Sequence, residues 1–159
     1  SLGCPIELQE RSPIAHALLQ DGLMRAAAFA NTTQDTALSR IINNMQLSNT
    51  NSILQPVQNI DVIYLDPMFP IRKKSAAVNK SMRAFHDLIG NDEDADQLLL
   101  HALAQDVCRI AVKRPRIAPF LANKPPSYSL EGKSSRFDIY ALKKLQTTND
   151  AETTNDTPE

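Results

Sequence analysis

Hydrophobic and polar positions in the first third of the chain predict a strand, a long helix and a second strand. Residues 6–10 alternate apolar and acidic or polar side chains, as a short strand does. Ser12 followed by Pro13 is typical of a helix start, because Ser can cap the first turn and Pro has a helical φ. Apolar side chains then recur at helical spacing to about Asn31, and residues 45–47 form a weaker strand candidate.

The middle of the chain predicts a β–α–α–β succession. Residues 61–65 are a dense β-branched and aromatic run ended by Asp66-Pro67, which predicts a buried strand of the parallel type. Residues 78–89 carry apolar side chains at intervals of four, three and four, which predicts an amphipathic helix closed by Gly90. A second helix is expected over 95–103, and a strand over 109–113.

The last third of the chain predicts a loop and then a hairpin. Residues 115–126 hold four prolines and are expected to be a loop. Residues 127–130 and 137–142 have strand patterns and are separated by a turn containing Gly132. Alternating strands and helices followed by a hairpin predict an α/β open sheet, mostly parallel with a terminal antiparallel hairpin.

Composition indicates a soluble globular chain of one domain. It has 159 residues and 17.6 kDa, with 42% hydrophobic and 22% charged residues. No apolar run reaches the roughly 18–20 residues of a membrane helix. Cys4 and Cys108 lie far apart, which favours neither a disulfide framework nor zinc, so a reduced, cytoplasmic setting is expected. Residues 1–145 are assigned to the domain, and residues 146–159, which repeat Thr-Thr-Asn-Asp, to a disordered acidic tail.

Charge is distributed unevenly along the chain although the net charge is -1. Residues 72–144 carry 14 basic and 8 acidic side chains, a balance of +6, whereas the segments before and after are acidic. A basic block of this kind is typical of a surface that meets phosphate, although it is equally compatible with solvated helix faces.

The segment Asp66-Pro67-Met68-Phe69-Pro70 follows the strongest predicted strand. Ligands of open α/β sheets bind at the carboxyl ends of the strands. The segment resembles the acid–Pro–Pro–aromatic loop of methyltransferases that modify exocyclic amines, with Met68 in place of the second proline. Such an amine is a poor nucleophile, because its lone pair is delocalised into the ring. An acceptor side chain that holds its N–H groups can direct the lone pair at a methyl donor. A plain Asp-Pro turn at a strand end is the alternative.

Further motifs make the resemblance specific. The chain resembles the RsmJ family of small-subunit rRNA guanine-N2 methyltransferases over nearly all of residues 2–141. The resemblance lies in the segments 8–13 (Leu-Gln-Glu-Arg-Ser-Pro), 64–70 (Tyr-Leu-Asp-Pro-Met-Phe-Pro) with 74–76 (Lys-Ser-Ala), 112–115 (Val-Lys-Arg-Pro) and 136–140 (Arg-Phe-Asp-Ile-Tyr).

The resemblance implies S-adenosyl-L-methionine as methyl donor and a guanosine of 16S rRNA, free or in the small ribosomal subunit, as acceptor. It implies a donor site made of Glu10 on the ribose hydroxyls with Arg11 beside it, Asn51 and Ser52 on the adenine, and Asp66. Asp66, with Pro67, would also hold the acceptor amine, and Phe69 would stack on the extruded guanine. Without the resemblance, Glu10 is interpreted as a surface acid beside Arg11.

Two basic groups are candidate RNA contacts because each follows the end of a predicted strand. They are Arg72, Lys73 and Lys74 after the Asp66 segment, and Lys113, Arg114 and Arg116 after the next strand. His16, His86 and His101 lie on predicted helices without a neighbouring ligand, so no metal site is expected.

The resemblance also implies elements that the chain does not contain. A class I methyltransferase of the Rossmann-like type has a first strand and a Gly-rich loop before the position of Glu10, and neither is found here. We therefore expect residues 1–145 to be the C-terminal part of such a domain. Two other functions stay open at this point: an amine methyltransferase acting on DNA or another RNA, and a non-enzymatic RNA-binding remnant.

Overall fold

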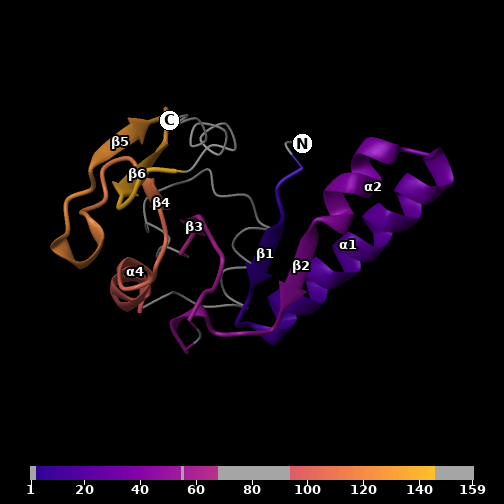
Figure 1. The fold of residues 1–159 in the computed structure, drawn as a ribbon, viewed down its shortest axis with the longest axis horizontal. Coiled ribbons are helices and arrows are strands. Elements are labelled where there is room, and N and C mark those ends of the chain that lie inside the picture. Colours follow the sequence, from indigo (N-terminus) through magenta and orange to yellow (C-terminus); the bar gives the residue numbers. More distant parts are fainter. Residues whose placement is uncertain (1–2, 55, 68–93, 146–159) are drawn as a thin grey trace, which may run out of the picture. The chain divides into compact units, whose positions relative to one another are not determined.

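The structure is a computed structural model that describes residues 3–54, 56–67 and 94–145. The chain divides into two compact units, one holding residues up to Pro56 and the other holding 57–67 together with the described residues from 94 onward. Figure 1 labels the elements of both. The helix expected over 78–89, the tail 146–159, Phe69 and the basic group Arg72–Lys74 lie outside the described residues.

The first unit is a two-stranded parallel sheet with two helices between its strands. Strand β1 (Ile6–Gln9) pairs with β2 (Met45–Ser48), and α1 (Pro13–Thr33) and α2 (Thr36–Asn43) connect them (Figure 1). The predicted helix start is confirmed: Ser12 Oγ accepts a hydrogen bond from the Ala15 amide at 3.3 Å, and Pro13 is the first helical residue. Because β1 and β2 are parallel, their carboxyl ends lie at the same edge.

Helix α2 was not predicted. Helix α1 ends at Thr33, and the next residue, Gln34, adopts a left-handed φ of 55° and turns the chain. Asp35 then caps a new helix, since its Oδ1 accepts a hydrogen bond from the Leu38 amide at 2.9 Å. The short η1 turn (Ser52–Leu54) follows β2.

The second unit is a four-stranded mixed sheet with the order β3-β4-β6-β5. Strand β3 (Val62–Leu65) runs parallel to β4 (Arg109–Pro115), whereas β6 (Ser135–Ala141) is antiparallel to both β4 and β5 (Tyr128–Glu131). The hairpin through Gly132 is confirmed. A Cβ on Gly132 would lie 2.9 Å from the Ser135 carbonyl oxygen, and the Gly132 amide donates to that same oxygen at 2.7 Å. The expected loop over 115–126 contains a short helical turn, η2 (Leu121–Asn123).

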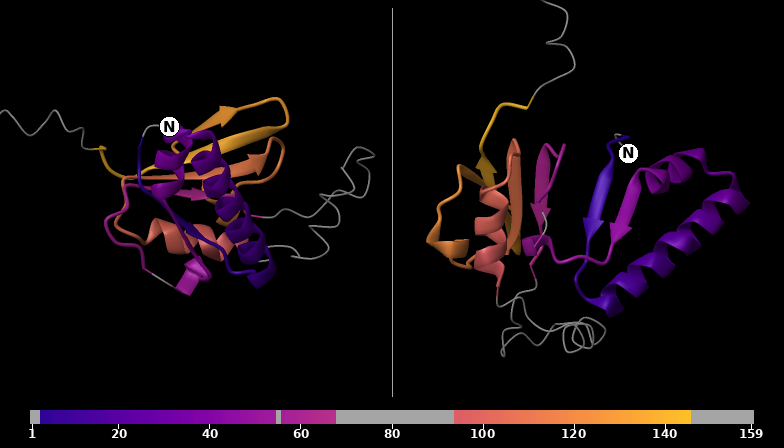
Figure 2. Two further views of the ribbon diagram at one scale, coloured as in Figure 1. Left: turned by 90° about the vertical axis from the view of Figure 1, so that its right-hand side faces the viewer. Right: turned by 60° about the horizontal axis from the view of Figure 1, so that its bottom comes forward.

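Helix α4 (Ala95–Leu103) lies along one face of this sheet, as the two views of Figure 2 show. Leu99 and Ala102 of α4 belong to one buried cluster with Ile110 and Val112 of β4 and Tyr140 of β6. The side chains of β3 are only partly buried, which differs from the prediction. Leu65 is buried on the α4 side, but Val62 and Tyr64 point to the opposite face and are exposed. Alternation along the strand produces this difference, since one face of β3 packs on the core.

Candidate active site

Asp66, directly after the carboxyl end of β3, forms an ion pair with Lys113 of the neighbouring strand β4. The last paired residues of the two strands are Leu65 and Val112, so Asp66 and Lys113 follow side by side. The Lys113 Nζ lies 2.8 Å from Asp66 Oδ2, and the side chains are 42% and 47% exposed. The pair is therefore held by the sheet and open to solvent, as a site for a large substrate must be.

Tyr64 joins this pair from the same face of β3, two residues before Asp66. Partial burial, followed by the negative charge of Asp66 and a hydrogen bond to it, raises the pKa of Tyr64 above its ordinary value. The hydrogen bond to Asp66 outweighs partial burial and raises the pKa of Lys113 as well. Both groups thus keep their protons at neutral pH. The Tyr64 ring also contacts Phe137 of β6, with ring centroids 6.4 Å apart.

Sequence reasoning did not assign Tyr64 to the site. A signal was present, since residues i and i+2 of a strand share a face and Tyr64 therefore had to lie beside Asp66. Pro67, which was assigned, is buried directly after Asp66 and lacks an amide proton, so the backbone at the strand end is stiff.

The predicted donor-site residues of the first unit lie at the carboxyl ends of β1 and β2. Glu10 directly follows β1, and its Oε1 accepts a hydrogen bond from the Ser12 amide at 2.7 Å. Its own amide donates to the carbonyl oxygen of Ser48, the last residue of β2, and its carbonyl oxygen accepts from the Thr50 amide. Asn51 Oδ1 accepts from the Ile53 amide at 3.1 Å and caps the η1 turn that Ser52 begins. Arg11 is exposed beside Glu10. The first unit therefore brings all four of these residues to one sheet edge.

The three predicted RNA contacts in and directly after β4 have different environments. Lys113 is paired with Asp66. Arg114 is only 5% exposed, and its Nη2 donates to the Pro119 carbonyl oxygen at 2.6 Å. Arg116 is exposed and lies 3.6 Å from Glu131. Burial lowers the pKa of Arg114, helped by the charge of Arg136, but leaves it a cation. The structure does not favour Arg114 as a phosphate contact, because its guanidinium points away from solvent.

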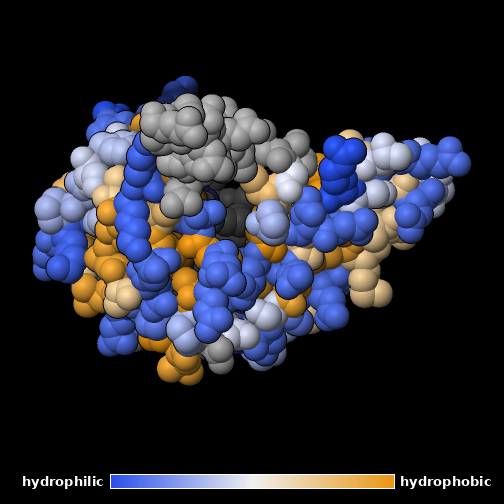
Figure 3. Space-filling view, in the orientation of Figure 1, coloured by the Kyte–Doolittle hydropathy of each residue, from blue (hydrophilic) through white to orange (hydrophobic). Residues whose placement is uncertain are grey.

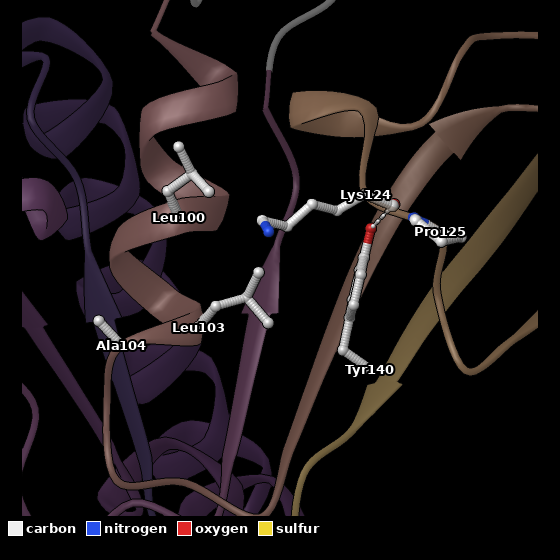
Figure 4. A pocket seen from close by; sticks show the side chains of 6 residues that line it. All are labelled: Leu100, Leu103, Ala104, Lys124, Pro125 and Tyr140. Atoms are coloured by element: carbon white, nitrogen blue, oxygen red, sulfur yellow. Dashed lines mark hydrogen bonds between the residues drawn. The ribbon is translucent and has the colours of Figure 1, made fainter.

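An open, apolar pocket of about 560 Å³ lies on the α4 side of the second unit. It is lined by Leu100, Leu103, Ala104, Lys124, Pro125 and Tyr140 (Figure 4). Its one buried polar group, the Tyr140 hydroxyl, already donates to the Lys124 carbonyl oxygen at 3.0 Å. Leu100, one of its lining residues, is 44% exposed, and hydrophobic side chains gather on the surface around α4 (Figure 3). It is on the sheet face opposite Asp66 and is not part of the strand-end site.

Within the described ranges, no group of three or more His, Cys, Asp or Glu side chains could hold a metal ion. None of the helices described there is long and apolar enough to cross a membrane.

Parallel strand pairs that are connected through helices carry Glu10 and Asp66 at the ends of β1 and β3. This arrangement is a Rossmann-like α/β fold of the methyltransferase class. The chain belongs to the family described as "Putative SAM-dependent methyltransferase", whose model matches residues 1–142. The resemblance found in the sequence motifs is confirmed by this match and by the curated relatives.

Curated relatives and a solved structure are similar to nearly the whole chain. A "Ribosomal RNA small subunit methyltransferase J" from Cellvibrio japonicus is 57% identical over 91% of this chain and 56% of the relative. The protein of the same name from Hahella chejuensis is 49% identical over 91% of this chain and 53% of the relative. A crystal structure of a SAM-dependent methyltransferase from Neisseria gonorrhoeae superposes with a TM-score of 0.60 at 31% identity, over 88% of this chain and 56% of that one. The chain spans about half the length of the curated relatives it matches.

Proposed function

We propose that the protein transfers a methyl group from S-adenosyl-L-methionine to the exocyclic N2 of a guanosine in 16S rRNA. The observation that carries this proposal is the ion-paired carboxylate of Asp66 at the carboxyl end of β3, in a chain of this family. The names of the relatives, which specify ribosomal RNA of the small subunit, support the choice of substrate. An rRNA substrate places the reaction in the cytoplasm.

The residues at the end of β1 are suited to a nucleoside. A carboxylate offers about four acceptor sites, and the Ser12 amide occupies one on Glu10, so capacity remains for the two ribose hydroxyls of the donor. Asn51 and Ser52 would contact the adenine, with Arg11 at the rim. When bound, S-adenosyl-L-methionine supplies an electrophilic methyl carbon on a sulfonium.

Asp66 is assigned to the acceptor amine. Its carboxylate accepts a hydrogen bond from an N–H group of the guanine N2, and this bond turns the nitrogen lone pair toward the methyl carbon. Pro67 stiffens the backbone segment that presents the Asp66 carboxylate. Phe69 would stack on the guanine. Arg116, with Arg72, Lys73 and Lys74, would contact RNA phosphates, since Arg116 is exposed at the strand end.

Methyl transfer with an isotopically labelled donor tests this function. The full-length protein is expected to label small ribosomal subunits or 16S rRNA that lack the modification, and mass spectrometry of the digested RNA should find N2-methylguanosine. Labelling of duplex DNA instead would support an amine methyltransferase of DNA. RNA binding with no labelling and no donor binding would support a non-enzymatic RNA-binding protein.

A further inference from the structure

Lys113 occupies a position that the sheet itself fixes. It lies in the central strand β4, beside the residue that follows β3 and opposite Phe137 of β6. Its backbone is paired with β6 and directly follows the last residue that β4 pairs with β3, whereas Arg116 lies beyond the strand end. A side chain anchored in this way is suited to hold another group in place.

The ammonium of Lys113 is already engaged. Its Nζ lies 2.8 Å from Asp66 Oδ2, a normal distance for a charge-assisted hydrogen bond. Contact with an RNA phosphate would compete with this bond. Arg116 differs in this respect, because 3.6 Å from its Nε to the Glu131 carboxylate is a loose, solvent-exposed pair.

The hydrogen bond from Lys113 has a geometric consequence for Asp66. A free aspartate side chain rotates about two bonds, and an exposed carboxylate samples several directions. Fixing Oδ2 restricts this rotation and thereby sets the direction of the remaining acceptor sites.

From this juxtaposition we propose that Lys113 is a positioning residue, which holds the Asp66 carboxylate in the direction from which it accepts the N–H of the target amine. In this role Lys113 is not a phosphate contact. The inference rests on the proposed function and assigns to Lys113 a part in it that differs from the one predicted from the sequence.

The test compares Lys113→Met with Lys143→Met in the full-length protein. Lys143 forms an exposed ion pair with Asp106 near the opposite end of β4, so it is a matched Lys–Asp pair away from the site. Lys113→Met is expected to lower kcat for methyl transfer by tenfold or more, with the KM for RNA and the salt dependence of RNA binding unchanged. Lys143→Met should alter none of these quantities. Lys113→Arg, which keeps the cation, should recover part of kcat.

Three results would overturn the inference. The first is an unchanged kcat in Lys113→Met with a salt slope of RNA binding that falls by about one unit, which would make Lys113 a phosphate contact. The second is an equal loss of kcat in Lys113→Met and Lys143→Met, which would indicate a general effect on the fold. The third is a wild-type protein that is inactive on rRNA, which would overturn the proposed function and this inference together. In the first two cases an active wild type leaves the proposed function standing.

Discussion

Two cation–carboxylate pairs in the same sheet have opposite environments. Arg136 and Asp138 of β6 form a buried pair, with side chains 8% and 2% exposed, whereas Lys113 and Asp66 form an open one. The buried pair has two parallel bonds, from Nε to Oδ1 at 2.8 Å and from Nη2 to Oδ2 at 3.0 Å. The open pair has one bond.

The buried pair is also satisfied on every side. Ser129 Oγ donates to Asp138 Oδ1 at 2.6 Å, Arg136 Nη1 donates to the Arg116 carbonyl oxygen at 2.6 Å, and the guanidinium lies 5.0 Å from the centre of the Phe120 ring. These contacts tie the 116–120 segment to the sheet. A cation–carboxylate pair therefore stabilises the structure on the α4 face of the sheet, whereas on the opposite face a similar pair leaves acceptor sites of the carboxylate available.

The largest expected effect is on the buried pair. Asp138→Ala leaves Arg136 as an uncompensated buried charge, which is expected to lower the free energy of unfolding by about 3–5 kcal/mol. Urea unfolding of the full-length protein measures this. Glu131→Ala, which removes the exposed partner of Arg116, is the control and should cost only about 0–1 kcal/mol. If Asp138→Ala and Glu131→Ala lowered the free energy of unfolding by similar amounts, burial would not be what makes the Arg136–Asp138 pair important for stability.

The open pair is expected to affect the reaction rather than stability. Asp66→Ala should lower the rate of methyl transfer by about a hundredfold or more, because an acceptor at the reacting centre is lost, with little change in unfolding. Asp61→Ala is the matched control and should leave the rate of methyl transfer unchanged, since Asp61 lies at the opposite end of β3. Near-normal turnover by Asp66→Ala would exclude Asp66 from the mechanism.

A third prediction separates two neighbouring arginines. Arg114→Met should lower the free energy of unfolding by about 1–3 kcal/mol, because the charge-assisted hydrogen bond from its guanidinium to the Pro119 carbonyl oxygen is lost, and should leave the salt slope of RNA binding unchanged. Arg116→Met should leave stability nearly unchanged and reduce that slope by about one unit. Filter binding across a salt series, with unfolding in parallel, distinguishes the two. The reverse pattern would restore Arg114 as the phosphate contact.

The smallest expected effect is on pH dependence. Lys113 has a pKa raised above its ordinary value of 10.5 by the hydrogen bond to Asp66. A raised folded-state pKa gives stability that is complete below the unfolded-state value and is lost as pH rises through the folded-state value. The wild type should therefore exceed Lys113→Met in stability by a constant amount from pH 7 to about pH 9, and by less above the ordinary pKa of lysine. Solvent screening limits the difference to about 0–1 kcal/mol. A difference that grows with alkaline pH would contradict the ion pair.

Local sequence determined most of the secondary structure and the family. The Ser12-Pro13 start, the Gly132 hairpin and the Asp66-Pro67 strand end follow from capping, turn and strand chemistry within a few residues. The motifs around them carried the resemblance that the comparisons confirm. Helix α2 escaped prediction because Gln34 adopts a left-handed conformation that its residue type does not favour.

Only the tertiary structure decided which charged side chains meet and which are buried. Lys113 and Asp66 are 47 positions apart, and the register of β3 against β4 places them side by side. The sequence grouped Lys113, Arg114 and Arg116 as one basic cluster. Alternation along β4 instead sends Arg114 to the opposite face from Lys113, where α4 and the loop after β4 exclude water. A strand's own residues specify that neighbours point to opposite faces, but the element that packs on one face decides which of them becomes buried.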